Sequence, residues 1–162
     1  MQNRKPTRLS GYDYSGRGAY FVTLCSQNRR CILSAVVGAD DPGGPRVRLS
    51  PCGEIVEHNL QIMREIYQDI QIDNYVIMPN HVHLLLTLCG RDGAPRSSPP
   101  TNTLSNFVTA LKKYTNKAYG ENIWQRSFHD HIIRDQKDYN ARWQYIDENP
   151  KKWLMGKDEY YA

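Results

Sequence analysis

The chain has 162 residues, of which 23% are charged, and a formal net charge of +4 at pH 7. This length suits one domain with a sizeable core, here taken as residues 1–162. No run of about 18 apolar residues is present, which argues against a membrane span, and the basic N-terminus has no apolar stretch behind it, which argues against a secretory signal. Four cysteines without a Cys-x-x-Cys pair favour reduced thiols in a cytoplasm over a zinc knuckle or a disulfide framework.

The first part of the chain gives strand, loop and helix signals in turn. A basic arm covers about residues 1–18, and the β-branched and aromatic residues 19–25 predict a strand. Residues 38–48 contain a cluster of Gly, Pro and Asp, which predicts a flexible loop. Ser50 and Pro51 suit the N-cap and the first position of a helix.

This helix is expected to extend to Ile66, although its apolar spacing is only approximate. Residues 70–78 predict a second strand. Asn80 then turns the chain into a third, antiparallel strand. Residues 90–102 are rich in Gly, Pro and Ser and predict another flexible loop.

Two helices and a strand complete the pattern. Between Thr103 and Tyr119 apolar residues recur at intervals of three and four, which predicts an amphipathic helix. Residues 128–134 predict a strand, and residues 136–149 a last helix that Pro150 ends. The order predicts an α+β fold, the ferredoxin-like split βαβ plan with a central antiparallel sheet, helices on one face and an added C-terminal helix.

The most distinctive motif is His81-Val82-His83, within the apolar run 75–88. Histidines two apart on a strand point to the same face of a sheet. The apolar residues around them indicate a largely buried strand. Such a strand rarely carries two imidazoles on one face unless something binds both, and a divalent metal is the obvious candidate.

Tyr145 and Asn149 lie one turn apart in the expected last helix, so they project from one face. Both could meet a metal held by His81 and His83, with coordination positions left open for catalysis. Glu148 is the rival third ligand, because a carboxylate suits magnesium. A metal beside a tyrosine suggests phosphoryl transfer, in which the metal polarises a phosphate oxygen, because a free phenol with a pKa of about 10 attacks poorly.

Basic residues stand at several places with aromatic neighbours, among eleven tyrosines and three tryptophans. Such a surface suits single-stranded or structured nucleic acid, because cations neutralise phosphates and rings stack on bases. Ordinary solvated charges and core aromatics are the alternative. The candidates for DNA contact are Arg4, Lys5, Arg8, Lys112, Lys113, Lys117, Arg126, Lys151 and Lys152.

A second pair, His129 and His131, repeats the His-x-His spacing on the strand expected at 128–134. The alternatives for this pair are a phosphate or DNA contact, support of the first pair, plain packing and a direct metal role. Tyr139 is the nearest rival nucleophile, but it lies six residues before Tyr145 and so points to a different face.

Three segments, 78–85, 124–134 and 145–153, resemble the single-tyrosine HUH transposases, and more closely the REP-associated tyrosine transposases. The segments 8–14 and 20–29 are also similar to that branch. The resemblance covers nearly the whole chain apart from the two expected loops.

The resemblance implies a ferredoxin-like domain that cuts single-stranded DNA near palindromic hairpins through a 5′-phosphotyrosine intermediate. It implies a divalent ion, Mg²⁺ or Mn²⁺, with His81 and His83 as ligands and Tyr145 as the nucleophile. Asn149 occupies the place of the third ligand, where a glutamine is the residue associated with the mobile-element enzymes.

The sequence thus predicts a metal-dependent endonuclease and strand transferase, cytoplasmic and associated with the nucleoid when bound to DNA, with no membrane partner. Two other classes remain as alternatives. One is a non-catalytic hairpin-binding module with structural histidines, and the other is a metal-dependent hydrolase that uses water and forms no covalent adduct. Both a monomer and a homodimer are compatible with the sequence.

Overall fold

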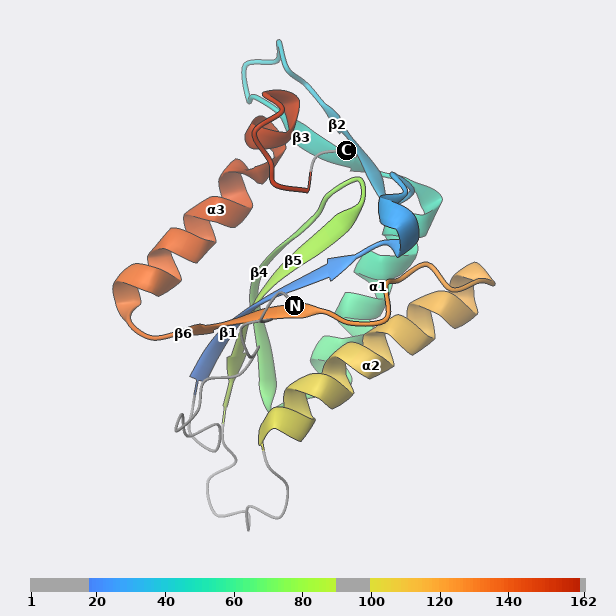
Figure 1. Cartoon of the computed structure of the whole chain (residues 1–162), viewed down its shortest axis with the longest axis vertical. Helices are drawn as coiled ribbons and strands as arrows, with labels where there is room; N and C mark the ends of the chain where they lie inside the picture. Colours follow the sequence, from blue (N-terminus) through green and yellow to red (C-terminus); the bar gives the residue numbers. More distant parts are fainter. Residues whose placement is uncertain (1–17, 90–99, 161–162) are drawn as a thin grey trace, which may run out of the picture.

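The computed structural model describes residues 18–89 and 100–160 (Figure 1). In chain order the elements are β1 (Gly18–Cys25), the 3-10 turn η1 (Gln27–Arg29), β2 (Ser34–Val37), β3 (Arg46–Leu49), α1 (Pro51–Ile66), β4 (Ile70–Ile77), β5 (His81–Leu88), α2 (Pro100–Tyr119), β6 (His129–Ile133) and α3 (Gln136–Leu154). Among these residues no helix is both long enough and apolar enough to cross a membrane.

Four strands form an antiparallel sheet in the order β4-β5-β1-β6. The connection from β1 to β4 contains α1, and the connection from β5 to β6 contains α2; in neither case are the two strands neighbours in this sheet. This is the split βαβ arrangement, so the predicted α+β fold is confirmed. The two central strands, β5 and β1, place His81 opposite Cys25 and His83 opposite Thr23.

The two faces of the sheet bury different sets of side chains. Val82 and Leu84 point into the larger core, together with buried residues of α1 and α2 such as Leu60 and Phe107. On the other face Leu85 packs with residues of α3 in a smaller cluster. Figure 1 shows α1 and α2 together on one side of the sheet and α3 on the other. Because side chains alternate along a strand, both histidines of β5 lie on the α3 side.

A short hairpin, β2 with β3, corrects the loop predicted at 38–48. Residues 46–48 belong to β3, and Val36 pairs with Val47. Four-residue strands next to several Gly and Pro residues give too few alternating positions for sequence recognition. Val36 and Val47 pack against the cluster under α3, so tertiary packing stabilises the hairpin.

The last helix does not end at Pro150, as the sequence predicted, but continues to Leu154. A proline inside a helix removes one backbone hydrogen bond and clashes with the preceding turn. Packing beyond the proline opposes this penalty, because Trp153 joins the cluster under α3 and Lys152 lies over the ring of Tyr145. Tertiary contacts therefore override the local signal.

The third correction concerns the start of α2, which lies at Pro100 rather than at Thr103. Proline suits the first turn of a helix, because its missing N–H has no intrahelical partner there. The predicted loop therefore loses residues 100–102, while residues 90–99 and most of the basic arm lie outside the described residues. None of the four cysteines forms a disulfide.

Candidate active site

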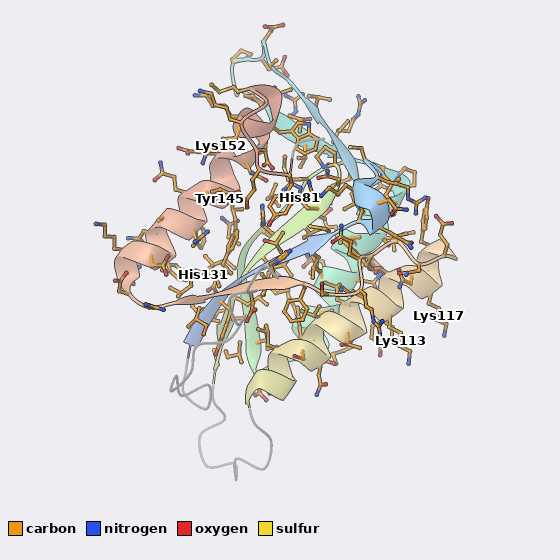
Figure 2. The ribbon with its side chains drawn as sticks, viewed as in Figure 1. His81, Lys113, Lys117, His131, Tyr145 and Lys152 are labelled. Atoms are coloured by element: carbon orange, nitrogen blue, oxygen red, sulfur yellow. The ribbon has the colours of Figure 1, made fainter. Side chains whose placement is uncertain are left out.

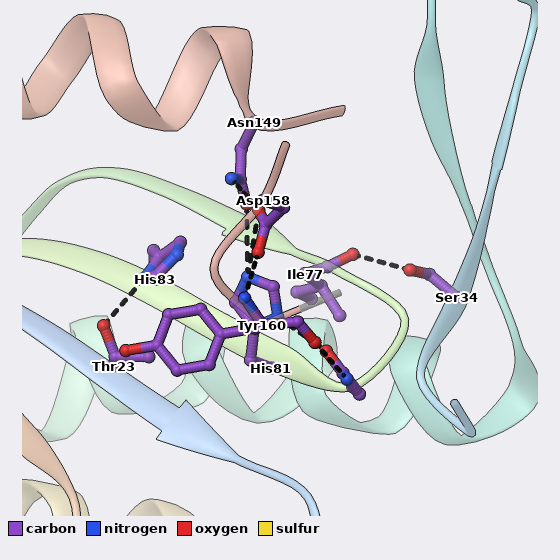
Figure 3. Close-up of polar contacts among 9 residues, drawn as sticks. Thr23, Ser34, Ile77, His81, His83, Asn149, Asp158 and Tyr160 are labelled. Atoms are coloured by element: carbon purple, nitrogen blue, oxygen red, sulfur yellow. Dashed lines mark hydrogen bonds and ion pairs between the residues drawn. The ribbon is translucent and has the colours of Figure 1, made fainter. Parts of the chain in front are cut away.

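The candidate site lies between the start of β5 and the second half of α3. His81 and His83 are both fully buried, and α3 brings Tyr145 and Asn149 over them (Figures 2 and 3). Asp135 caps α3 by accepting a hydrogen bond from the amide of Asp138 at 2.7 Å. The structure thus brings together all four residues that the sequence predicted for metal binding and nucleophilic attack.

His81 lies between the side-chain oxygens of two asparagines. Its Nδ1 is 2.7 Å from Oδ1 of Asn80, and its Nε2 is 3.2 Å from Oδ1 of Asn149. In both asparagines a hydrogen bond from the amide nitrogen fixes the orientation of the side chain. Asn80 donates through Nδ2 to the carbonyl of Tyr160 at 2.8 Å, and Asn149 donates through Nδ2 to the carboxylate of Asp158.

Burial lowers the pKa of His81 to about 4, although the charge of Asp158 and the hydrogen bond of Asn149 act in the opposite direction. The imidazole is therefore neutral at pH 7 and carries one N–H. If the shorter contact, to Asn80, uses this proton, the lone pair of Nε2 faces the oxygen of Asn149. Two acceptors that face each other in a buried site are matched by a cation between them.

His83 presents a second free nitrogen. Its Nδ1 is 2.7 Å from the hydroxyl of Thr23, whereas its Nε2 is buried and has no hydrogen-bond partner among the described residues. Burial lowers the pKa of His83 well below its usual range, and the nearby His81 and Arg142 lower it further. Metal-binding histidines commonly use one ring nitrogen for the ion and fix the other by a hydrogen bond, and this is the pattern here.

The residues present therefore fit a divalent ion, with two imidazole nitrogens and one amide oxygen as donors. No cluster of three or more His, Cys, Asp or Glu side chains suited to a metal occurs in the described part of the chain. The donor set thus depends on Asn149. Asp158 lies nearby, with its carboxylate 3.9 Å from Nε2 of His81.

Tyr145 packs against His83. Its ring lies edge-on to His83, with the centroids 5.3 Å apart, and edge-on to Phe21 at 5.7 Å. The ammonium of Lys152 is 4.7 Å from the centroid of the Tyr145 ring. Burial raises the pKa of Tyr145 to about 12, helped by Glu159 and Asp158 and opposed by Arg142. The phenol is therefore protonated at neutral pH and needs activation before it can attack.

The segment after α3 returns to the site and contributes two residues that sequence reasoning missed. Asp158 is buried against Asn149. The ring centroids of Tyr160 and His81 are 4.6 Å apart. Figure 3 shows Asp158 and Tyr160 beside His81. The backbone amide of Tyr160 donates to Asp158 at 2.7 Å. Neither residue belongs to a helix or strand, so no periodicity in the sequence could have indicated them.

The rival candidates from the sequence lie elsewhere. Glu148 is exposed and accepts a hydrogen bond from Gln144 within α3 at 2.8 Å. Tyr139 donates its hydroxyl proton to Asp73 at 2.8 Å, outside the group around the histidines. His131 contacts Asp138, 2.8 Å away, while His129 is exposed.

The predicted DNA-contact residues separate into groups. Lys112 donates its protons to the backbone carbonyls of Gln125 and Ser127, at 2.8 and 3.1 Å, so its ammonium stabilises a turn. Lys113 and Lys117 are exposed on α2, across the sheet from Tyr145 (Figure 2). Lys152 lies within the candidate site. Arg126 and Lys151 are exposed, and Arg4, Lys5 and Arg8 lie outside the described residues.

A split βαβ sheet with a buried His-x-His pair and a tyrosine on the last helix is the arrangement that the sequence resemblance to single-tyrosine HUH transposases implied. No protein-family model matches the chain. An uncharacterised protein of Haemophilus influenzae is 27% identical over 179 residues, which cover 100% of this chain and 95% of that protein. The REP-associated tyrosine transposase of Escherichia coli is 27% identical over 140 residues, 86% of this chain and 70% of that protein.

A solved structure of a REP-associated tyrosine transposase bound to a REP hairpin is also similar. It superimposes with a TM-score of 0.59 at 25% sequence identity, and the match covers 98% of this chain and 77% of the other. In sequence and in fold the chain is thus similar to REP-associated tyrosine transposases.

Proposed function

We propose that the protein is a metal-dependent endonuclease and strand transferase for single-stranded DNA, which it cuts beside palindromic hairpins. The observation that carries the proposal is the packing of Tyr145 against His83, whose Nε2 is buried without a partner among the described residues. The bound REP hairpin in the similar structure supports hairpin DNA as the substrate class.

In this proposal His81, His83 and Asn149 hold Mg²⁺ or Mn²⁺. The ion, when bound, neutralises charge that develops on the scissile phosphate. Thr23 and Asn80 hold the two imidazoles through their Nδ1 atoms, which leaves the Nε2 atoms to bind the ion. The burial of the histidines excludes water, which strengthens every electrostatic interaction in the site.

Tyr145 is the nucleophile. Its hydroxyl oxygen forms a bond to phosphorus while the bond from phosphorus to the 3′ oxygen breaks. The phenol loses its proton, and the departing oxygen becomes a 3′-hydroxyl. The product is a 5′-phosphotyrosine, which keeps the energy of the broken phosphodiester. A 3′-hydroxyl of another strand can therefore reverse the reaction and join the strands without ATP.

A labelled oligonucleotide tests this function. The palindromes in the DNA that flanks the gene supply hairpins with single-stranded ends, and the label is placed on the 3′ end. With Mn²⁺ we expect the label to move with the denatured protein, and EDTA should abolish this adduct while hairpin binding largely survives. Tyr145→Phe should reduce adduct formation about 10³-fold or more, because it removes the attacking oxygen.

Other outcomes distinguish the alternatives. An adduct that survives in Tyr145→Phe contradicts the assigned nucleophile, with Tyr139→Phe as the matched control. Cleavage without any adduct indicates a hydrolase that uses water. Tight hairpin binding without cleavage, for any hairpin and either metal, indicates a binding module.

A further inference from the structure

In the second histidine pair the two side chains have different surroundings. His131 on β6 directs its Nε2 to the carboxylate of Asp138 in the first turn of α3, at 2.8 Å. His129 is exposed. In Figure 2 His131 lies below the helix that carries Tyr145. His131 therefore connects the edge strand β6 to the first turn of α3.

Asp138 connects His131 to a third residue, Arg142. The other carboxylate oxygen of Asp138 is 3.7 Å from Nε of Arg142, one turn further along α3. Burial opposes ionisation of Asp138, but His131, the Arg134 amide and Arg142 together lower its pKa below the usual range. Asp138 is therefore an anion at neutral pH, and both of its oxygens have positively charged or hydrogen-bonding neighbours.

Arg142 lies at the border of the candidate site. Its guanidinium carbon is 5.0 Å from the centroid of the Phe21 ring, and that ring stacks on His83 with centroids 4.9 Å apart. The charge of Arg142 acts on the site itself, since it lowers the pKa of both Tyr145 and His83.

Arg142 has N–H groups that can form further hydrogen bonds. A guanidinium has five N–H donors, and the contact with Asp138 involves Nε. Within the described part of the chain no hydrogen bond to the terminal nitrogens is found, and one third of the side chain is exposed, at 33%. A cation that is anchored at one end and open at the other suits an anionic ligand.

We propose that Arg142 binds the non-bridging oxygens of the scissile phosphate beside Tyr145, and that Asp138 and His131 hold its guanidinium in position. The inference rests on the proposed function and names a further catalytic residue for it. A planar guanidinium matches two phosphate oxygens at once, and the contact strengthens as charge develops during attack by Tyr145. Phe21 contributes a cation–π contact to the guanidinium.

The first experiment measures adduct formation in a single turnover with Mn²⁺. Arg142→Gln should slow it about 10²–10³-fold, the usual effect of removing one donor to a developing charge. Arg142→Lys should form the adduct faster than Arg142→Gln, because it keeps the positive charge. In Arg142→Ala, millimolar guanidinium added to the solution should restore part of the lost rate. Arg64→Gln on α1, on the other side of the sheet, is the charge-matched control and should leave the rate unchanged.

The positioning role of Asp138 has its own readout. Asp138→Asn should slow the adduct less than Arg142→Gln does, and the double variant should be no slower than Arg142→Gln alone, because both changes act through one guanidinium. Additive effects, or no rescue by guanidinium, would show that these residues act only on the fold and would overturn the proposal.

The second experiment does not depend on catalysis. The affinity for the hairpin with its single-stranded end is measured at several salt concentrations for the wild type, Arg142→Gln and Arg64→Gln. Loss of one contact to a single-strand phosphate should reduce the slope of log K against log salt by about 0.7. A salt-dependence slope that is unchanged in Arg142→Gln overturns the proposed phosphate contact. A wild-type protein that binds the hairpin but forms no adduct overturns the proposed function, and with it the catalytic role of Arg142.

Discussion

At the scale of single residues, the two asparagines decide the chemistry of His81. A free amide could turn to offer either its oxygen or its nitrogen, but Asn80 and Asn149 are each held by an acceptor on their nitrogen side. Both oxygens therefore face the imidazole, and a neutral ring can donate to only one of them. Nε2 of His83, which is buried and has no hydrogen-bond partner in the part of the chain that the structure describes, adds a second lone pair to the site.

This geometry distinguishes the two candidates for the third ligand. With Mn²⁺ present at about 100 times its Kd, the wild type should gain about 2.7 kcal/mol of stability, visible as a rise in Tm. Asn149→Ala should lose most of this rise, because it removes the oxygen that faces Nε2. Glu148→Ala should keep it, since Glu148 bonds to Gln144 on the exposed side of α3.

The baseline of the Asn149 variant must be measured separately. Asn149→Ala also leaves the buried carboxylate of Asp158 without its amide partner, so the metal-free Tm should fall by the equivalent of about 1–3 kcal/mol. The metal-induced difference, and not the absolute Tm, identifies the ligand. A Mn²⁺ response that persists in Asn149→Ala and vanishes in Glu148→Ala would reverse the assignment.

At the scale of elements, the start of α1 is fixed to the segment that leads into β2. Ser50 caps the helix, since its hydroxyl accepts from the amide of Gly53 at 3.0 Å. The carbonyl of Leu33 also lies against this turn, and it accepts the backbone amide of Ser50 at 3.0 Å. A Cβ at position 53 would lie 2.0 Å from that carbonyl oxygen, so only glycine permits this approach.

Gly53→Ala should therefore destabilise the protein, although alanine is favoured over glycine in helices by about 1 kcal/mol. The added methyl group must push α1 away from the carbonyl of Leu33 and weaken the contacts beside β2. Thermal unfolding checks the sign. His58→Ala at an exposed position of the same helix is the control and should leave the Tm unchanged or raise it slightly. A higher Tm for Gly53→Ala would show that helix propensity outweighs the close approach.

The elements that the sequence predicted correctly are those whose pattern is local and long. The strands of the main sheet and the amphipathic helix α2 repeat apolar residues over several positions, and Ser50 with Pro51 marked the start of α1. The β2–β3 hairpin and the passage of α3 through Pro150 depend instead on packing between distant segments, which no local pattern contains.

The residues of the candidate site also divide into those that a local pattern indicates and those that depend on contacts between distant segments. His81 and His83 could be recognised because their spacing matches a strand, and Tyr145 with Asn149 because their spacing matches a helix. Asp158 and Tyr160 could not, since they belong to an irregular segment that reaches the histidines only after the chain has folded. Arg142 follows a helical spacing in α3, but its proposed role depends on contacts with Phe21 of β1 and, through Asp138, with His131 of β6.

At the scale of the whole molecule, the two faces of the sheet differ in how firmly they are covered. Helix α1 buries four apolar side chains in the larger core: Cys52, Val56, Leu60 and Met63. Helix α3 buries only Ile146 and Pro150 completely among its apolar residues, and its rings of Tyr139, Tyr145 and Trp153 are partly buried. Less apolar burial means that α3 should separate from the sheet at a lower free energy than α1.

Native-state hydrogen exchange tests this difference. Backbone amides of α3 should exchange through an opening of lower free energy than amides of β1, β5 and α1, which should open only with global unfolding. Ile146→Ala should lower the opening free energy of α3 by about 2–5 kcal/mol while the sheet retains much of its protection. Leu60→Ala is the matched control in the larger core and should lower protection throughout the molecule. Equal opening free energies for α3 and β5 in the wild type would contradict this expectation, because the helix that carries Tyr145 could then not move without unfolding of the sheet. DNA would in that case have to reach Tyr145 through rearrangement of side chains and of the C-terminal segment alone.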